Sequence, residues 1–358
     1  MYLGEKTETR DNNFDFLRFV AATLVLFFHN ALAYYGNSSV SPLENYIPSG
    51  LNIFFIISGF LITRSFCYDE NALRFLKKRI LRIFPGLILV VLVTAFIVGP
   101  LTTTLPLSDY FHNEAFGKYL NNVFLFKIRH FLPGVFENNP LPNVTNGSLW
   151  SLPLEFLLYL IVLVLGSLKL LNKTKTYLWL LVISLFCLLH IYVGDWADKN
   201  LLLCSGQKFF KMAMLFLIAS YLYMKRNLIK LDFCLFIVAT LLWLCSVQTE
   251  FNYIIEWFTL PYMIIFIAYA KIPFINNWAN FVKGDYSYGI YIWGFLIQQL
   301  FVFYFGTRID FHLYMLLTFI TTLFVAVLSY HIVEKPMLNL KNVAIFDKIK
   351  SLFNFNKA

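Results

Sequence analysis

Long apolar runs separated by short polar segments make up most of this chain. Each run is about 17 to 23 residues long, and at about 1.5 Å per residue each can cross a hydrocarbon core of about 30 Å. The runs lie at residues 14–35, 50–67, 83–100, 149–166, 177–193, 201–223, 231–247, 253–270, 286–305 and 311–333. The pattern predicts an all-α polytopic membrane protein with about ten transmembrane helices.

The composition supports a membrane protein and disfavours a soluble one. Of the 358 residues, 59% are hydrophobic and only 14% are charged, whereas soluble domains are typically about 25% charged. The net charge of +9 has no compact basic domain to carry it, so we expect contacts with anionic lipid and no binding of nucleic acid. The five cysteines are irregularly spaced and form no CxxC pair, so no metal site is indicated.

The distribution of lysine and arginine predicts the orientation. With both termini in the cytoplasm, the inner segments hold 22 of these residues and the outer segments hold 5. We therefore expect a membrane-embedded domain at 1–340, a cytoplasmic basic tail at 341–358, and a long extracytoplasmic loop at 101–148. A loop of this length is uncommon unless it is functional or disordered. The oligomeric state cannot be predicted.

Two polar residues interrupt the first apolar run. Arg18 and His29 are eleven residues apart, which is about three helical turns, so they share a face and lie about 16 Å apart along the axis. Arg18 is thus near the cytoplasmic end, where Asp15 can pair with it, and His29 is in the outer half. The alternatives are a snorkelling arginine and a histidine that only bonds a neighbouring helix.

Further polar residues lie near the third, fourth and sixth runs. Arg79 and Arg82 are three residues apart and can form a fork for phosphate oxygens, although a lipid-facing basic loop is the simpler interpretation. Glu155 lies about 9 Å inward from the outer end of its run, a depth that matches His29. Its carboxylate could orient the imidazole or make a structural hydrogen bond. Lys208 and Lys211 could meet a phosphate or belong to the outer loop.

Taken together, these motifs resemble the acyltransferase 3 family of integral membrane acyltransferases. The matches run in family order from about residue 11 to residue 337, which is nearly the whole chain. They are Arg18 and His29, the FFIISGFLI segment at 54–62, Arg79 and Arg82 with Pro85, Trp150-Ser151-Leu152 with Glu155, the SYGIYIW segment at 287–293, and Val333-Glu334-Lys335-Pro336.

The resemblance implies an acyl-CoA-dependent O-acyltransferase in the cell inner (cytoplasmic) membrane, with acetyl-CoA as the expected donor. It implies that His29 is the essential histidine and that Arg18, Arg79 and Arg82 are functional arginines, and it supports Glu155 more weakly. Coenzyme A would place its phosphates against the three arginines. His29 would act as general base or as acyl carrier.

The acceptor and two sequence departures stay open. The family implies a hydroxyl of an envelope or surface glycan, free or lipid-linked, while small-molecule, lipid or peptide acceptors remain alternatives. A transporter without chemistry is a further alternative, because intramembrane charges also mark substrate pathways. The family often has Asp where this chain has Asn52, and His where this chain has Gly294.

Overall fold

The computed structural model describes residues 2–8, 12–36, 46–171, 200–201, 204–276, 278 and 282–342. Their regular secondary structure is helical apart from one pair of two-residue strands, β1 (Asn200–Leu201) and β2 (Cys204–Ser205). Six helical stretches are long and apolar enough to cross a membrane, namely Phe14–Tyr35, Gly50–Tyr68, Ala72–Thr102, Gly147–Ser167, Ser287–Arg308 and Phe311–Asn339. The all-α prediction is confirmed for this part of the chain.

The other expected spans have mixed outcomes. Three apolar helices, α10 (Gly206–Met224), α11 (Phe233–Ser246) and α12 (Asn252–Tyr269), occupy three of the predicted runs. At 14 residues, α11 is about 21 Å long and too short to cross a core of about 30 Å upright. The run at 177–193 and nearly all of the tail at 341–358 lie outside the described residues. The count of ten spans and the placement of the termini stay predictions.

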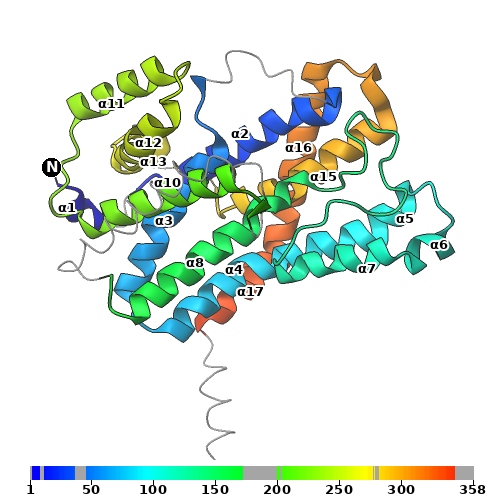
Figure 1. Cartoon of the computed structure of the whole chain (residues 1–358), viewed down its shortest axis with the longest axis horizontal. Helices are drawn as coiled ribbons and strands as arrows, with labels where there is room; N and C mark the ends of the chain where they lie inside the picture. The colour runs from blue at the N-terminus through cyan, green and yellow to red at the C-terminus, as the bar shows by residue number, and fades with distance from the viewer. Residues whose placement is uncertain are drawn as a thin grey trace, which may run out of the picture.

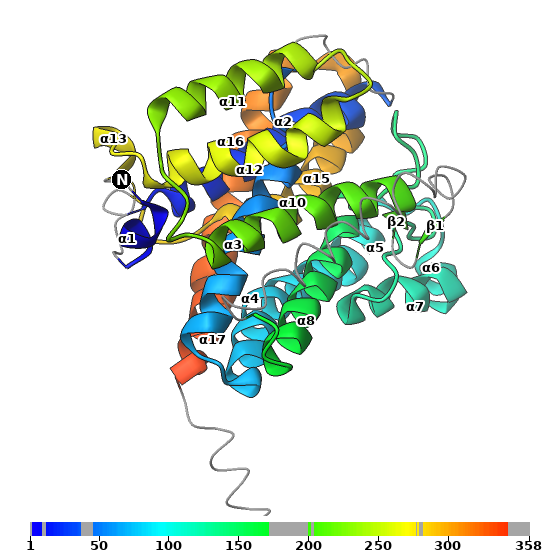
Figure 2. The same cartoon turned by 60° about the vertical axis from the view of Figure 1, so that its left-hand side comes forward.

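A row of packed helices forms the core (Figures 1 and 2). α15 (Ser287–Phe305) packs between α2 (Phe14–Tyr35) and α16 (Phe311–Ser329), and α2 also packs on α3 (Gly50–Tyr68). α3 continues the row to α10, which packs on α12, and α11 covers α12. Gly59 allows a close approach of α3 to α10, because a Cβ there would lie 2.2 Å from the Phe216 carbonyl oxygen.

A second group of helices lies against this row. α4 (Ala72–Val93) and α8 (Leu152–Ser167) pack on each other and on α3, and the short 3-10 turn η4 (Gly147–Ser151) leads into α8. The C-terminal side of α16 continues through a π-helical turn η8 (Tyr330–Glu334) into α17 (Lys335–Asn339) and the 3-10 turn η9 (Leu340–Asn342), and these pack on α4. The C-terminal elements of the described chain thus pack against α4.

The third span begins earlier than predicted. The sequence placed its start at residue 83, but the helix begins at Ala72, where the Asn71 side chain accepts a hydrogen bond from the Arg74 backbone N–H. Arg79 and Arg82 therefore lie on the helix, and the interpretation of this cluster as a basic loop is wrong. The helix continues through η2 (Thr94–Val98) and α5 (Gly99–Thr102).

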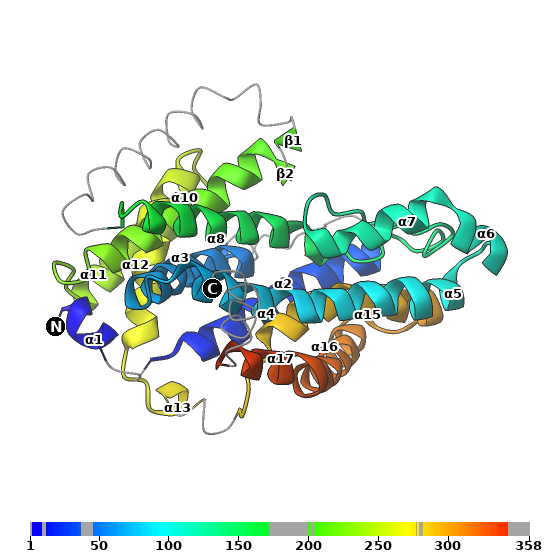
Figure 3. The same ribbon diagram turned by 90° about the horizontal axis from the view of Figure 1, so that it is seen from below.

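The long segment at 101–148 is not a structureless loop. It contains α6 (Leu107–His112), α7 (Glu114–Leu120) and the 3-10 turn η3 (Asn121–Phe124). α7 and η3 run back alongside the far end of the α4 helix (Figure 3). The short elements α1 (Leu3–Thr7), α13 (Pro273–Asn276) and η7 (Gly306–Arg308) complete the described fold.

Candidate active site

A cavity of about 510 Å³ lies between α2, α3, α4, α8 and α15. Its volume falls within the range of about 300 to 1,000 Å³ that is usual for small-molecule sites. Five cations line it, and two of them were not singled out from the sequence. They are Arg18, Lys78, Arg79, Arg82 and Lys341. The three predicted arginines, which come from two different helices, therefore do share one cavity.

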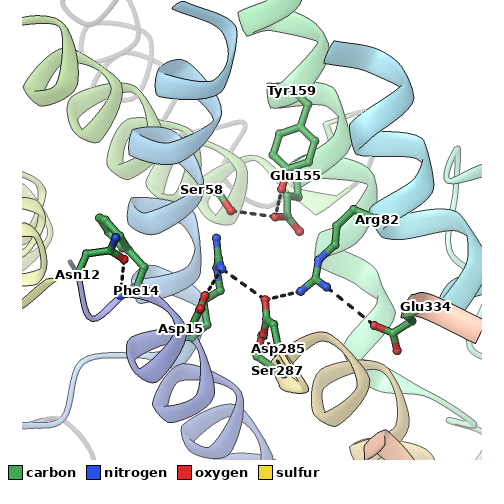
Figure 4. Close-up of polar contacts among 11 residues, drawn as sticks. Asn12, Phe14, Asp15, Ser58, Arg82, Glu155, Tyr159, Asp285, Ser287 and Glu334 are labelled. Carbon is green, nitrogen blue, oxygen red and sulfur yellow. Dashed lines mark hydrogen bonds and ion pairs between the residues drawn. The ribbon is translucent and has the colours of Figure 1, made fainter. Parts of the chain in front are cut away.

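Asp285 joins two of these arginines. Its Oδ2 atom lies 2.6 Å from Arg82 Nη2 and 3.4 Å from Arg18 Nη1. Arg18 also pairs with Asp15 at 2.9 Å, as the sequence predicted, and Arg82 Nη1 lies 4.0 Å from Glu334 Oε2. Figure 4 shows Arg82 between the two carboxylates. The ion pairs fix the direction of both guanidinium groups.

The carboxyl group of Asp285 is held ionised by these neighbours. Burial by itself would raise its pKa, but Arg82, Arg18 and hydrogen bonds from the backbone N–H and hydroxyl of Ser287 outweigh burial, so the pKa lies below its usual value. Sequence reasoning missed Asp285, because it read the residue only as part of a short inner loop. Its place two residues before the matched segment at 287–293 was the available signal.

Arg79 has hydrogen-bonding capacity to spare. Its Nη2 atom donates to Ser65 Oγ at 3.3 Å, and its Nε is buried without a hydrogen-bond partner among the described residues. The guanidinium carbon lies 5.5 Å from the centre of the Phe75 ring and 6.0 Å from that of Tyr159. An arginine that is held by aromatic rings and incompletely bonded is suited to bind an anion that enters the cavity.

Glu155 lines the same cavity as the arginines. Its Oε1 atom accepts hydrogen bonds from the Ser58 hydroxyl, at 2.9 Å, and from the hydroxyl of Tyr159, one turn further along α8 (Figure 4). The depth match to His29 suggested an imidazole partner for this carboxylate. The structure does not form that pair, because α8 directs Glu155 towards Ser58 of α3.

His29 lies beside a separate, narrow gap that is too small for a water molecule. The Phe295 ring meets the imidazole edge-on, with the ring centres 5.3 Å apart, and His29 is half-buried. Among the described residues it makes no hydrogen bond, so neither ring nitrogen is committed to a protein partner. The interpretation of His29 as a histidine that bonds a neighbouring helix is therefore not supported.

Tyr291 separates the two spaces. It lines both the large cavity and the gap beside His29. Its hydroxyl lies 2.6 Å from Ser151 Oγ and also donates to the Ser148 carbonyl oxygen. Arg18 and His29 therefore border neighbouring spaces and not one continuous cavity. Tyr291 lies in the matched segment at 287–293, but sequence reasoning did not single it out among the other aromatic residues of its run.

The departures at positions 52 and 294 have structural consequences. Asn52 donates to Glu256 Oε1 at 2.5 Å, and Glu256 Oε2 lies 2.9 Å from Lys211 Nζ. Lys211 is thus paired within the protein. The ammonium group of Lys208 lies 5.2 Å from the centre of the Trp150 ring. The two lysines lie outside the lining of the arginine cavity.

Gly294 faces α2 next to His29. A Cβ added at this position would lie 2.6 Å from Leu26 Cδ1, so Leu26 occupies the space that a larger side chain would need. The gap beside His29 is lined by Leu26 and Gly294, together with Phe295 and Tyr291. Packing at this position is therefore apolar, and no second imidazole from the described residues lines the gap beside His29.

Comparisons with known proteins agree with the motifs. The family model described as "Acyltransferase domain", of the acyltransferase 3 type, matches residues 11–331. An O-acetyl transferase of Shigella phage Sf6 is 28% identical over 350 residues, which cover 92% of this chain and 96% of that protein. Nodulation protein 10 of Rhizobium leguminosarum bv. viciae is 31% identical over 169 residues, which cover 44% of each. No solved structure matches.

The family match covers most of the chain and includes the cavity arginines, His29 and Glu155. The apolar helices agree with a multi-pass membrane protein. This chain therefore belongs to the acyltransferase 3 family and is a membrane acyltransferase.

Proposed function

We propose that the protein transfers an acyl group, with acetyl expected, from acyl-CoA to a hydroxyl of an envelope or surface glycan. The observation that carries the proposal is the cavity itself. It gathers five cations at its walls and borders, through Tyr291, the space beside His29. The O-acetyl transferase of the phage, which aligns along most of the chain, supports an O-linked product.

The donor would bind through its phosphates. Coenzyme A carries several phosphate charges, and Arg79 offers an unsatisfied Nε, while Lys78 and Lys341 add charge at the cavity wall. Arg18 and Arg82 are already oriented by Asp285, so they can receive a phosphate with little further loss of side-chain entropy. The thioester end would then extend within the cavity towards Ser151 and Tyr291.

His29 would serve the transfer step. The acceptor hydroxyl oxygen attacks the thioester carbonyl carbon, the new C–O bond forms, and the C–S bond breaks. A neutral imidazole takes the hydroxyl proton and returns it to the departing thiolate. In the alternative course the imidazole nitrogen accepts the acyl group first and passes it to the hydroxyl. Both courses need an imidazole nitrogen without a protein partner, and within the described part of the chain His29 makes no hydrogen bond.

The proposed acceptor is a glycan hydroxyl at the outer side of the cell inner membrane, because His29 is expected in the outer half of its span. A lipid, peptide or small molecule is the alternative acceptor. Membranes that contain the protein should transfer label from radioactive acetyl-CoA into a glycan fraction, and membranes with His29→Ala should not. Label in a lipid, peptide or small-molecule fraction would show that the acceptor belongs to that class and is not a glycan. Absence of any transfer would contradict the proposed activity.

A further inference from the structure

The segment at 101–148 packs on an exposed face of η2, the turn that continues α4. Phe96 is 49% exposed, and its ring lies 5.4 Å from that of Phe116 and 6.3 Å from that of Phe111. Tyr110 is fully buried, and its hydroxyl donates to the Ala95 carbonyl oxygen at 2.8 Å. Figure 3 shows α7 beside the far end of the α4 helix. This segment therefore packs beside exposed apolar side chains of the Ala72–Thr102 helix, which is long and apolar enough to cross a membrane.

A concavity of about 300 Å³ opens on this segment, away from the arginine cavity. Its lining consists of three cations, one amide and two aromatic rings: Lys118, Asn121, Phe124, Phe126, Lys127 and Arg129. The three cations are all the lysines and arginines that residues 101–148 contain. No carboxylate lines the concavity, and the nearest recorded acidic partner is Glu114, 2.6 Å from Lys118 on the exposed face of α7.

The backbone holds this site in shape. The buried Asn122 side chain donates to the Arg129 carbonyl oxygen at 2.8 Å and accepts from the Arg129 N–H at 2.7 Å. Leu125 has a φ of 56°, in the left-handed region, and its side chain is only 5% exposed. Burying Leu125 leaves its neighbours Phe124 and Phe126 outside, at 63% and 79% exposure. The burial of Leu125 and the two hydrogen bonds of Asn122 thus offset the conformational strain of the turn.

We propose that this concavity, which we call the loop cup, binds the phosphate of an anionic membrane lipid. The lipid would belong to the leaflet on the side of the membrane where residues 101–148 lie. Two neighbouring exposed phenylalanines are unfavourable in water but are favourable in acyl chains near headgroups. Lysines and arginines at that depth pair with lipid phosphate. The segment is attached to an exposed apolar face of η2, which a lipid can reach from within the bilayer, and this favours a lipid over a soluble glycan.

Binding should be measured on the full chain in zwitterionic detergent by native mass spectrometry, with phosphatidylglycerol titrated against phosphatidylcholine. The variant Lys118→Gln/Lys127→Gln/Arg129→Gln should raise the Kd of phosphatidylglycerol about tenfold or more, since each cation near an anionic lipid contributes to binding. The control variant Lys230→Gln/Lys271→Gln/Arg308→Gln removes the same charge at exposed positions elsewhere and should leave that Kd unchanged.

Two further measurements separate a lipid from a simple anion. Phe124→Ser/Phe126→Ser should weaken phosphatidylglycerol binding several-fold, and inorganic phosphate at equal concentration should not compete. Equal affinity for phosphatidylcholine, effective competition by phosphate, or an unchanged Kd in the loop-cup triple variant would each overturn the proposal. Unaltered acetyl transfer by the triple variant in detergent would show that its fold is intact, so a loss of lipid binding would belong to the cup.

Discussion

The Oδ2 atom of Asp285 lies 2.6 Å from Nη2 of Arg82, and the same oxygen lies 3.4 Å from Arg18 Nη1. A single carboxylate from the segment before α15 therefore joins α2 to α4 at the cationic wall of the cavity. These two ion pairs hold Arg18 and Arg82 in place and leave their remaining N–H groups available to a ligand. Asp285 acts through the arginines and is a positioning residue.

Asp285→Asn should weaken donor binding and lower stability. The amide keeps the shape but loses the charge, so Arg18 and Arg82 lose their common anchor. The expected loss is on the order of 2 kcal/mol, less than the about 3 to 5 kcal/mol of a fully buried pair, because the side chains of Arg82 and Asp285 are 23% and 19% exposed. The KM for acetyl-CoA should rise by about tenfold with a smaller change in kcat, as steady-state kinetics would show.

Asp232→Asn is the matched control for this substitution. Asp232 pairs with the exposed Lys230 at 3.5 Å, and neither residue lines the cavity. Exposed ion pairs of this kind contribute little to stability. An equal rise in KM for the two variants would contradict a specific positioning role for Asp285.

The stabilisation from Asp285 should depend on pH in a defined direction. The folded-state pKa of this carboxyl is lowered below the usual value of about 3.9, so its contribution is fully present above that value and is lost as pH falls towards the folded pKa. Thermal unfolding of wild type and Asp285→Asn should therefore differ most at neutral pH, and the difference should shrink below about pH 4. A constant difference down to pH 3 would mean that the charge of Asp285 does not contribute.

Donor binding should depend more on the planar guanidinium group of Arg79 than on that of the other cavity arginines. Among the described residues Arg79 donates one hydrogen bond, to Ser65, and its Nε has no partner, so its other N–H groups are free to bind phosphate oxygens. Arg79→Ala should raise the KM for acetyl-CoA by about tenfold or more, and Arg79→Lys should raise it less. Arg74→Ala, on the same helix but outside the cavity lining, should have little effect. Equal kinetics for Arg79→Ala and wild type would exclude donor contact by this residue.

Glu155 should support the reaction without acting on His29. Its oxygen accepts from Ser58 and Tyr159, and the structure forms no pair with the imidazole. Glu155→Gln should therefore lower kcat by about tenfold while the pH dependence of kcat stays in place. Tyr159→Phe, which removes one of the two donors, should have a smaller effect. A shift of the pH profile in Glu155→Gln would show coupling to His29 that this geometry lacks.

The sequence predicted the helices and the cation wall because both follow from local rules. Apolar length marks α2, α3 and α15, and a spacing of three places Arg79 and Arg82 on one face. Position along an axis gave a matching depth for His29 and Glu155, but depth does not determine which way a side chain points around the helix. Packing of α8 against α3 decides this direction, and it brings Glu155 to Ser58.

The residues that sequence reasoning missed depend on tertiary contacts. Asp285 lies in a polar segment that looks like any inner loop, and only the packing of α15 beside α2 and α4 brings it between two arginines. Tyr291 is one of several aromatic residues in its run. Only the fold shows that its hydroxyl forms hydrogen bonds with Ser151 and Ser148 of η4. The pairing of Lys211 with Glu256 likewise joins distant helices, α10 and α12.

His29 is the residue on which the proposed chemistry depends most. The imidazole is half-buried beside Phe295, has no hydrogen-bond partner among the described residues, and is separated from the arginine cavity by Tyr291. His29→Ala should lower acetyl transfer by about 10²- to 10⁴-fold, the usual contribution of a general base. His112→Ala, on the exposed turn that ends α6, should retain activity.

Wild type quenched after mixing with labelled acetyl-CoA alone should carry label on His29 only if the imidazole takes the acyl group. Unlabelled protein with rapid transfer once acceptor is added would assign the general-base course, and full activity in His29→Ala would exclude both.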